Sequence, residues 1–178
     1  MQSAVERFAG ALTIVAFVIA VATLVLLVRR RVPDWLRDEV ALPSAWAIAA
    51  MTTAGSLWMS EVADYAPCLL CWYQRIAIYP LVVITGIAAW RRDGQVWRYV
   101  VPIAALGSMV SIWHLIIERN PSLGGACDPA APCAVRWVEE FGFLTLPAMA
   151  LTAAVAIALL TLAARPAAGP ATHPTDPA

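Results

Sequence analysis

Charged side chains are scarce in this sequence. Only 13% of its 178 residues are charged, against 61% that are hydrophobic, whereas a soluble globular domain usually carries about 25% charged residues. The formal net charge is zero and no basic tract occurs, so nucleic-acid binding has no support. The charges fall in short clusters between long apolar runs, because an ionised side chain near the bilayer centre costs about 3 kcal/mol or more. The composition therefore predicts a membrane protein and argues against a soluble domain.

Five apolar stretches reach or approach the length of about 20 residues that a transmembrane helix needs. They are residues 8–28, 44–61, 72–90, 99–117 and 143–164. The second is the least apolar, and its small and hydroxylated residues favour a packed inner helix because they let helices approach closely. The first could instead be a secretory signal peptide, but its apolar run is too long and arginines follow it. We interpret it as a retained anchor, and the tail from 165 onward as disordered.

The arginines predict the orientation of these helices. Eight of them follow the first, third and fifth stretches: Arg29, Arg30, Arg31, Arg37, Arg91, Arg92, Arg98 and Arg165. The opposite side holds only Arg7, Arg119 and Arg136, with Arg75 near the boundary. Loops rich in arginine stay in the cytoplasm. The amino terminus, the region around residue 68 and the loop 118–142 are therefore expected outside.

Four cysteines occur in two close pairs, Cys68 with Cys71 and Cys127 with Cys133. On the orientation above, all four lie outside the cytoplasm, where disulfides form and persist. An even count in two close pairs on the oxidising side predicts two disulfides.

The first pair stands at the start of the third predicted helix, directly after Pro67. A cysteine at a helix amino terminus has its thiolate stabilised by unpaired backbone N–H groups, which lowers the thiol pKa and makes the sulfur a better leaving group. A disulfide between Cys68 and Cys71 would be a poor structural staple, because so short a loop constrains the unfolded chain little. This pair is therefore predicted to make and break its bond repeatedly.

Cys127 and Cys133 lie in a segment rich in glycine and proline that should form an exposed, irregular loop. A partner thiolate could reach a disulfide there, which suits the entry step of an exchange relay. One alternative for this pair is a static clip of the loop. Another is a non-enzymatic zinc site of all four thiolates, although an oxidising compartment counts against it.

Arg75 strengthens the functional interpretation of the first pair. Cys68, Cys71, Arg75 and Tyr79 are spaced so that they form one stripe along a helix. Arg75 would lie about 6 Å deeper than Cys71, where it could stabilise the Cys71 thiolate and donate hydrogen bonds to the carbonyl of a lipid-soluble electron acceptor. The alternative is that Arg75 snorkels to the lipid headgroups. Gln74 is either a further donor or polar surface.

Two other residue types near the cysteines could contribute. His114 lies near the outer end of the fourth stretch, with Glu118 one turn beyond it. It could transfer protons, and a packing or interfacial histidine would explain it equally well. Tryptophans near the span ends indicate an interfacial belt. Trp72 could also shape the reactive site because it directly adjoins Cys71.

The string PCLLCWYQRIAIYP at residues 67–80 resembles the DsbB family of membrane disulfide oxidoreductases, and within it the short BdbC-type branch. Further likeness runs through GSLWMSE at 55–61, through Pro132 with Cys133, and through FGFLTLP at 141–147. The resemblance covers roughly residues 45–155. A CxxC motif alone is weak evidence, but this long string together with a second pair is specific.

The resemblance implies a function. Such proteins reoxidise a thioredoxin-fold dithiol oxidase of the DsbA or BdbD type outside the bacterial cytoplasmic membrane and pass two electrons to a membrane quinone, ubiquinone or menaquinone. By position, Cys68 and Cys71 would be the quinone-coupled pair, and Cys127 and Cys133 the pair that meets the partner. Arg75 would contact the quinone, while His114 matches only loosely.

The chain departs from the family pattern in having an extra helix. The resemblance implies a four-helix catalytic bundle at 43–164, preceded by an extra transmembrane helix and loop at 1–42 and followed by a cytoplasmic tail at 165–178. A quinone reductase of the vitamin K epoxide reductase type is an alternative, but there the loop pair precedes the membrane CxxC, whereas here it follows.

Overall fold

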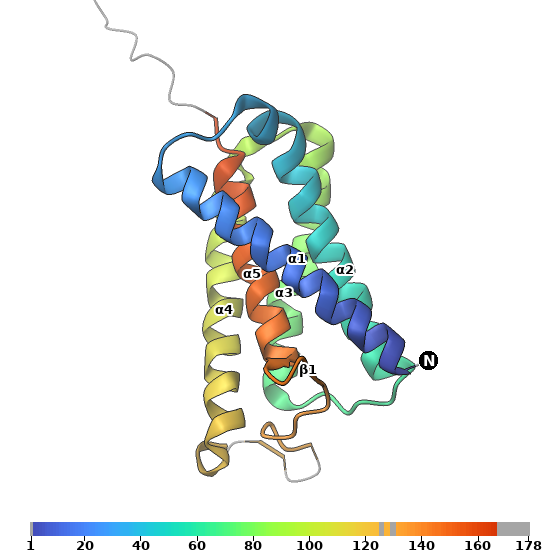
Figure 1. Ribbon diagram of the computed structural model, residues 1–178. Coiled ribbons are helices and arrows are strands. Elements are labelled where there is room, and N and C mark those ends of the chain that lie inside the picture. The colour runs from blue at the N-terminus through green and yellow to red at the C-terminus, as the bar shows by residue number, and fades with distance from the viewer. Residues whose placement is uncertain (1, 125–126, 129–130, 167–178) are drawn as a thin grey trace, which may run out of the picture.

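The computed structural model describes residues 2–124, 127–128 and 131–166, and these form an all-α bundle (Figure 1). Its long helices are α1 (Gln2–Val28), α2 (Ala41–Glu61), α3 (Leu69–Arg91), α4 (Trp97–Arg119) and α5 (Leu146–Ala163). Five segments containing these helices are long and apolar enough to cross a membrane. The predicted fold class, an all-α membrane protein with one helix before the bundle of four, is confirmed.

Short elements join the long helices, and the sequence had not predicted them. A π-helical turn, η1 (Leu36–Val40), leads into α2, while the 3₁₀ turns η2 (Gly94–Val96) and η3 (Pro121–Leu123) flank α4. After the second cysteine pair, β1 (Glu139–Glu140) pairs antiparallel with β2 (Leu144–Thr145). This hairpin explains why α5 begins at Leu146, three residues later than predicted.

The centre of the bundle is α5, which packs against α1, α2 and α4. Its small residues Ala153, Ala154 and Ala156 are at most 4% exposed, and such residues let helix backbones approach closely. The prediction that the stretch 44–61 is the inner helix is therefore wrong in part: α2 packs on α3 and α5 but leaves Trp46, Met51 and Leu57 exposed.

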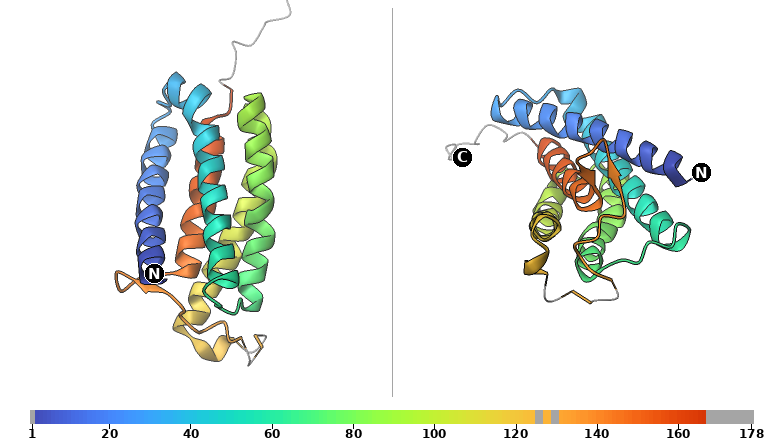
Figure 2. Two further views of the ribbon diagram at one scale, coloured as in Figure 1. Left: turned by 90° about the vertical axis from the view of Figure 1, so that its right-hand side faces the viewer. Right: turned by 60° about the horizontal axis from the view of Figure 1, so that its bottom comes forward.

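The extra helix α1 lies along the outside of the bundle, obliquely across α5 and α2 (Figures 1 and 2). It buries Ala16, Ala20 and Thr23. Its opposite side exposes large apolar residues such as Phe17 and Val18. An exposed apolar face of this kind is expected of a helix that meets lipid.

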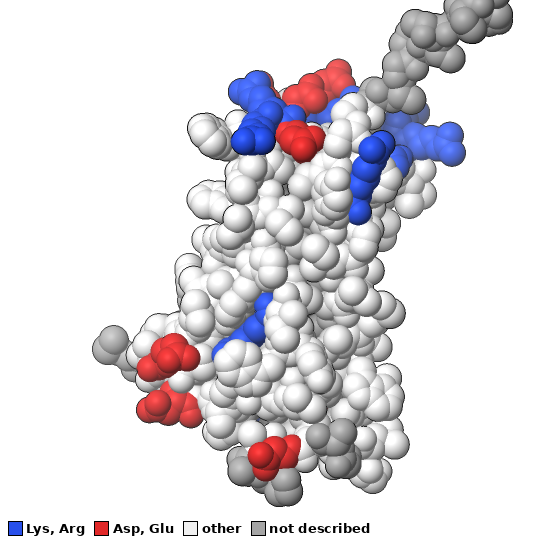
Figure 3. All heavy atoms as spheres, turned by 180° about the vertical axis from the view of Figure 1, so that it is seen from behind, with Lys and Arg blue, Asp and Glu red and all other residues white. Residues whose placement is uncertain are grey.

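The two ends of the bundle differ in charge (Figure 3). Basic residues gather at the end where α1 runs into α2 and where α3 runs into α4. The opposite end holds the start of α1, the start of α3 and the loop after α4. Tyr65 donates a hydrogen bond to Glu6 there. The tail that was expected to be disordered lies outside the described residues from 167 onward.

Candidate active site

Cys68 and Cys71 face each other at the beginning of α3. Cys68 is the N-cap of this helix, with an extended backbone, and its sulfur accepts a hydrogen bond from the Cys71 backbone N–H. The two Sγ atoms lie 3.0 Å apart, and both residues are free thiols. The sequence predicted two disulfides, and the structure shows this pair as a dithiol.

His114 on α4 contacts both cysteine pairs. Its Nε2 atom lies 3.7 Å from the Cys68 Sγ and 3.0 Å from the Cys133 carbonyl oxygen. Because a carbonyl oxygen can only accept, this contact assigns the proton to Nε2. The Nδ1 atom is buried and has no hydrogen-bond partner among the described residues. His114 is therefore a donor to the Cys133 backbone and to a Cys68 thiolate, with a free lone pair on its other nitrogen.

The contacts that stabilise a thiolate gather on Cys68. The pKa of the Cys68 thiol is lowered first by a hydrogen bond with the Cys71 thiol, and then by His114 and the Cys71 backbone N–H, which together outweigh the effect of burial. The sequence had suggested that Arg75 would stabilise a thiolate on Cys71. The structure instead favours Cys68 as the thiolate of the reduced pair.

The second pair forms a disulfide, with the Cα atoms of Cys127 and Cys133 5.9 Å apart. The expectation of an exposed loop holds only in part. Cys133 is 2% exposed and packs in one apolar cluster with Cys68 and Ile117, whereas Cys127 is half-buried at the edge of that cluster. The two sulfurs of this disulfide therefore differ in their access from outside.

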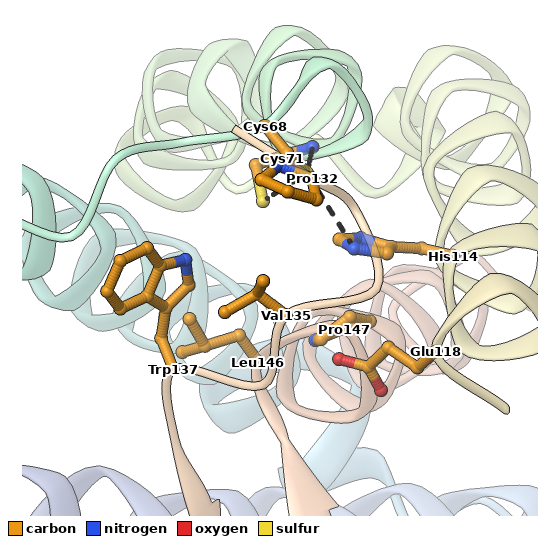
Figure 4. Close-up of a pocket in the computed structure, with 9 residues that line it drawn as sticks. All are labelled: Cys68, Cys71, His114, Glu118, Pro132, Val135, Trp137, Leu146 and Pro147. Carbon is orange, nitrogen blue, oxygen red and sulfur yellow. Dashed lines mark hydrogen bonds between the residues drawn. The ribbon is translucent and has the colours of Figure 1, made fainter. Parts of the chain in front are cut away.

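A small cavity of about 10 Å³ lies beside Cys68 and Cys71 (Figure 4), which is room for about one water molecule. Its lining residues come from α3, α4, the cysteine loop and the start of α5: Cys68, Cys71, His114, Glu118, Pro132, Val135, Trp137, Leu146 and Pro147. Glu118 is buried and accepts a hydrogen bond from the Thr145 hydroxyl at 2.8 Å. The cavity thus joins the free dithiol to two groups that can carry protons.

Cys71 also lines a second, much larger cavity, an apolar groove of about 640 Å³. The size falls within the range of about 300–1,000 Å³ that is typical of ligand sites. The polar side chains at its cysteine end include Arg75, Tyr79 and Ser56. An added Cβ on Gly55, which also lines the groove, would meet no atom within 4 Å.

Arg75 is fixed at the cysteine end of this groove. Its Nε donates to the Ser56 hydroxyl at 3.1 Å and its Nη2 to the Ser56 carbonyl at 3.0 Å. Tyr79 donates to the same hydroxyl at 3.1 Å. These bonds join α3 to α2, so the side chain lines the groove and does not snorkel freely to the headgroups. A cation held beside an apolar groove could bind the polar end of a lipid-soluble ligand.

The two remaining predicted residues take different places. Trp72 is 51% exposed, and the Arg75 guanidinium carbon lies 5.2 Å from its ring centroid. Its side chain contacts Arg75, and its backbone N–H donates to the Cys68 carbonyl at 3.1 Å. Gln74 is buried, lines the groove and donates to the Ser111 hydroxyl at 3.1 Å, so it links α3 to α4 and is not polar surface.

Several residues of the site were not predicted from the sequence. Trp137 is one of the tryptophans that the sequence left to a general interfacial belt, with no link to the cysteines; it stacks on Tyr65 with ring centroids 5.3 Å apart and lines both cavities. Ser56 was only part of the family-like string 55–61. Neither residue carries a spacing pattern that points to the cysteines, because each reaches the site from another segment of the chain.

Titration of Cys71 variants tests which contact stabilises the Cys68 thiolate in the reduced protein. We expect Cys71→Ala to raise the pKa of Cys68 toward the ordinary thiol value of about 8.5, because the largest stabilising hydrogen bond is lost. Cys71→Ser keeps a hydroxyl donor and should keep the pKa low. The thiolate ultraviolet absorbance of each variant, with the loop disulfide intact, measures the titration against pH. Equal pKa values in both variants would contradict the assigned hydrogen bond.

The same shift makes the stability of the reduced protein depend on pH. The folded state holds the Cys68 thiolate at a pH where the unfolded chain still binds the proton, so stability rises with pH between the lowered pKa and about 8.5. This contribution to stability is lost as the pH falls through the lowered pKa of Cys68 in the folded state.

Comparisons with known proteins identify the family of this chain. The family described as "Disulfide bond formation protein DsbB" matches residues 37–164. "Disulfide bond formation protein C" of Bacillus subtilis (strain 168) is 42% identical over 120 residues, covering 66% of this chain and 87% of the relative. A "Probable disulfide formation protein" of Coxiella burnetii is 38% identical over 133 residues, covering 72% of this chain and 90% of the relative. No solved structure matches. The chain belongs to the DsbB family of membrane disulfide oxidoreductases.

Proposed function

We propose that this protein reoxidises a thioredoxin-fold dithiol oxidase of the DsbA or BdbD type and passes the electrons to a membrane quinone, ubiquinone or menaquinone. The observation that carries the proposal is the position of Cys71. Its side chain lines the small cavity with Cys68 and His114 and also the large groove with Arg75. The Cys68–Cys71 dithiol thus lies beside the loop disulfide on one side and beside an apolar groove on the other.

The proposed setting is the cytoplasmic membrane of a bacterium, with the cysteines on the extracytoplasmic face. The uneven distribution of arginine supports this, since the end of the bundle away from the cysteines carries most of the basic residues. We assign residues 43–164 as the catalytic bundle, 1–42 as the extra helix with its loop, and 165–178 as a cytoplasmic tail.

The entry step takes place at the loop disulfide. A partner thiolate attacks the half-buried Cys127, because Cys133 is only 2% exposed, and the Cys133 thiolate leaves. The partner's second thiol then attacks the mixed disulfide, which releases an oxidised partner and a reduced loop pair. The partner loses two electrons, and the loop gains them.

The inner step transfers these electrons to the pair on α3. The Cys133 thiolate attacks the Cys68 sulfur of a Cys68–Cys71 disulfide, with which it shares an apolar cluster, and Cys71 leaves as the thiolate. Cys127 then attacks Cys133, so the loop disulfide re-forms and Cys68 is released. His114 supports both attacks, since its Nε2–H holds the Cys133 backbone beside Cys68. An oxidised loop with a free Cys68–Cys71 dithiol, as in this structure, is the state that follows this step.

The last step returns the α3 pair to its disulfide. A bound quinone accepts two electrons and two protons. Arg75, held by Ser56 through Nε and Nη2, has further N–H donors at the end of the groove that Cys71 shares. The Cys68–Cys71 bond would form as the dithiol gives up two electrons and two protons to the quinone, and His114 and Glu118 are placed to pass the protons through the small cavity.

The two alternatives from the sequence receive less support. The disulfide between Cys127 and Cys133 counts against a zinc site of four thiolates. The donors of Cys68, Cys71 and His114 do lie within 4.8 Å of one another, but a dithiol beside a second disulfide favours exchange. Membership of the DsbB family argues against the vitamin K epoxide reductase type.

The central test uses purified protein, added quinone and a reduced thioredoxin-fold partner, followed by quinone absorbance. Cys68→Ser or Cys71→Ser should slow quinone reduction roughly a thousandfold or more, because members of a catalytic unit act together. As a control, the double variant of Cys127 and Cys133 to Ser should lose activity with the protein partner but keep it with a small dithiol. Quinone reduction by the Cys68 and Cys71 variants at the normal rate would rule out the mechanism.

A matched pair of serines on α2 tests the quinone end. Ser56→Ala removes the hydroxyl that positions Arg75 and Tyr79, and we expect the KM for quinone to rise about three- to tenfold with little change in kcat, the effect of one lost hydrogen bond. Ser60→Ala is the control, since Ser60 does not line the groove and its hydroxyl bonds within α2, to Leu57, Glu61 and the Ser56 carbonyl, and leaves the Ser56 hydroxyl untouched. Equal KM values for the two variants would remove Ser56 from the site.

The entry cysteine is identified by trapping. A partner whose second thiol is changed to serine cannot resolve the mixed disulfide, so the complex should accumulate. Mass spectrometry of its peptides should find the partner bonded to Cys127. A bond to Cys133 would show that the loop opens before attack.

A further inference from the structure

The extra helix α1 has no role in the family comparison, because the matched region begins at residue 37. In the structure α1 packs chiefly against α5, on which α2 also packs, and α1 and α2 make few contacts with each other. The large groove lies between them, and Met149, Ala150 and Ala153 of α5 contribute to its floor. One wall of the groove is therefore supplied by a helix that the family core lacks.

The α1 wall is long and uncharged. Its lining residues extend over more than three helical turns: Val5, Phe8, Ala9, Leu12, Thr13, Val15, Ala16 and Ile19. On the facing wall, lining residues of α2 extend from Met59 to Ser44, a distance of about 22 Å at the rise of an α-helix. The groove is thus an elongated apolar channel, with Arg75 and Cys71 at one end.

The amino-terminal half of α1 is fixed to the reactive end. Glu6 accepts a hydrogen bond from Tyr65, and this contact raises the pKa of Tyr65 to about 12, so the hydroxyl stays a donor. Tyr65 in turn stacks on Trp137. A Cβ on Gly10 would lie 3.1 Å from the Phe141 ring, which shows how closely α1 packs on the hairpin. The channel wall is therefore held in place beside both cysteine pairs.

We propose that α1 forms one wall of a binding site for the isoprenoid tail of the quinone whose ring lies beside Cys71 and Arg75. The proposal rests on quinone reduction being the function of the site. A lipid-soluble quinone has a polar ring and a long, thin, apolar tail, and the channel has a cationic end and a long apolar body. Continuity with the redox-active cysteine favours a quinone over the acyl chain of a phospholipid.

Two neighbouring alanines provide a matched test in the full-length protein. Ala9 lines the channel, whereas Ala11 is exposed on another side of α1. The readout is photo-labelling by azido-benzoquinones and azido-naphthoquinones that carry either no tail or two isoprenoid units. Ala9→Phe should raise the half-saturating concentration of the tailed probes about tenfold, a change of about 1.4 kcal/mol, and leave the tailless probes unaffected. Ala11→Phe should change neither.

Each other outcome has a distinct meaning. If the wild-type protein neither reduces nor is labelled by either quinone, the proposed function fails. If the wild type is labelled and active but Ala9→Phe and Ala11→Phe behave alike, α1 does not bind the tail. A photo-reactive benzoylphenylalanine in place of Ala9 gives a second measurement: cross-links to quinone support the proposal, and cross-links only to phospholipid overturn it.

Discussion

The unpaired backbone N–H groups at the start of α3 need acceptors, and the Cys68 sulfur supplies one by accepting from the Cys71 N–H. This local constraint fixes where both sulfurs lie. Because Cys68 is the N-cap, its side chain turns back over the first turn, and the two Sγ atoms come within 3.0 Å of each other. A helix terminus thereby becomes a site where a disulfide can form and break without moving the backbone far.

The two cysteines at this helix terminus have different neighbours. Cys68 lies toward α4 and the loop, where His114 links it to the Cys133 carbonyl. Cys71 lies toward the groove, where Ser56 holds Arg75. In a bilayer an unpaired polar group is costly, and three polar side chains of α3 beside the groove are bonded to other helices: Gln74 to Ser111, and both Arg75 and Tyr79 to Ser56. The same bonds that satisfy these groups also align α2, α3 and α4 around the dithiol.

Small residues make the groove possible. Gly55 leaves open space on α2, and the short side chains of Ala150 and Ala153 on α5 take up little of the groove. The packing of α1 on α5 then closes one side without filling the space. Contacts of α1 with Tyr65 and with the hairpin at Phe141 connect this wall to the segments that carry the cysteines.

The sequence by itself determined the number of spans, the end of the bundle that is rich in arginine and the position of the first cysteine pair at a helix N-terminus, because hydropathy, charge and helix boundaries are local properties. It also placed Arg75 one turn below Cys71. Only the tertiary structure decided that α5 is the central helix, that Cys133 is buried against Cys68, that His114 bonds to the loop, and that Trp137 and α1 line the groove. These depend on contacts between residues far apart in the chain, and no periodicity in the sequence encodes which helix faces which.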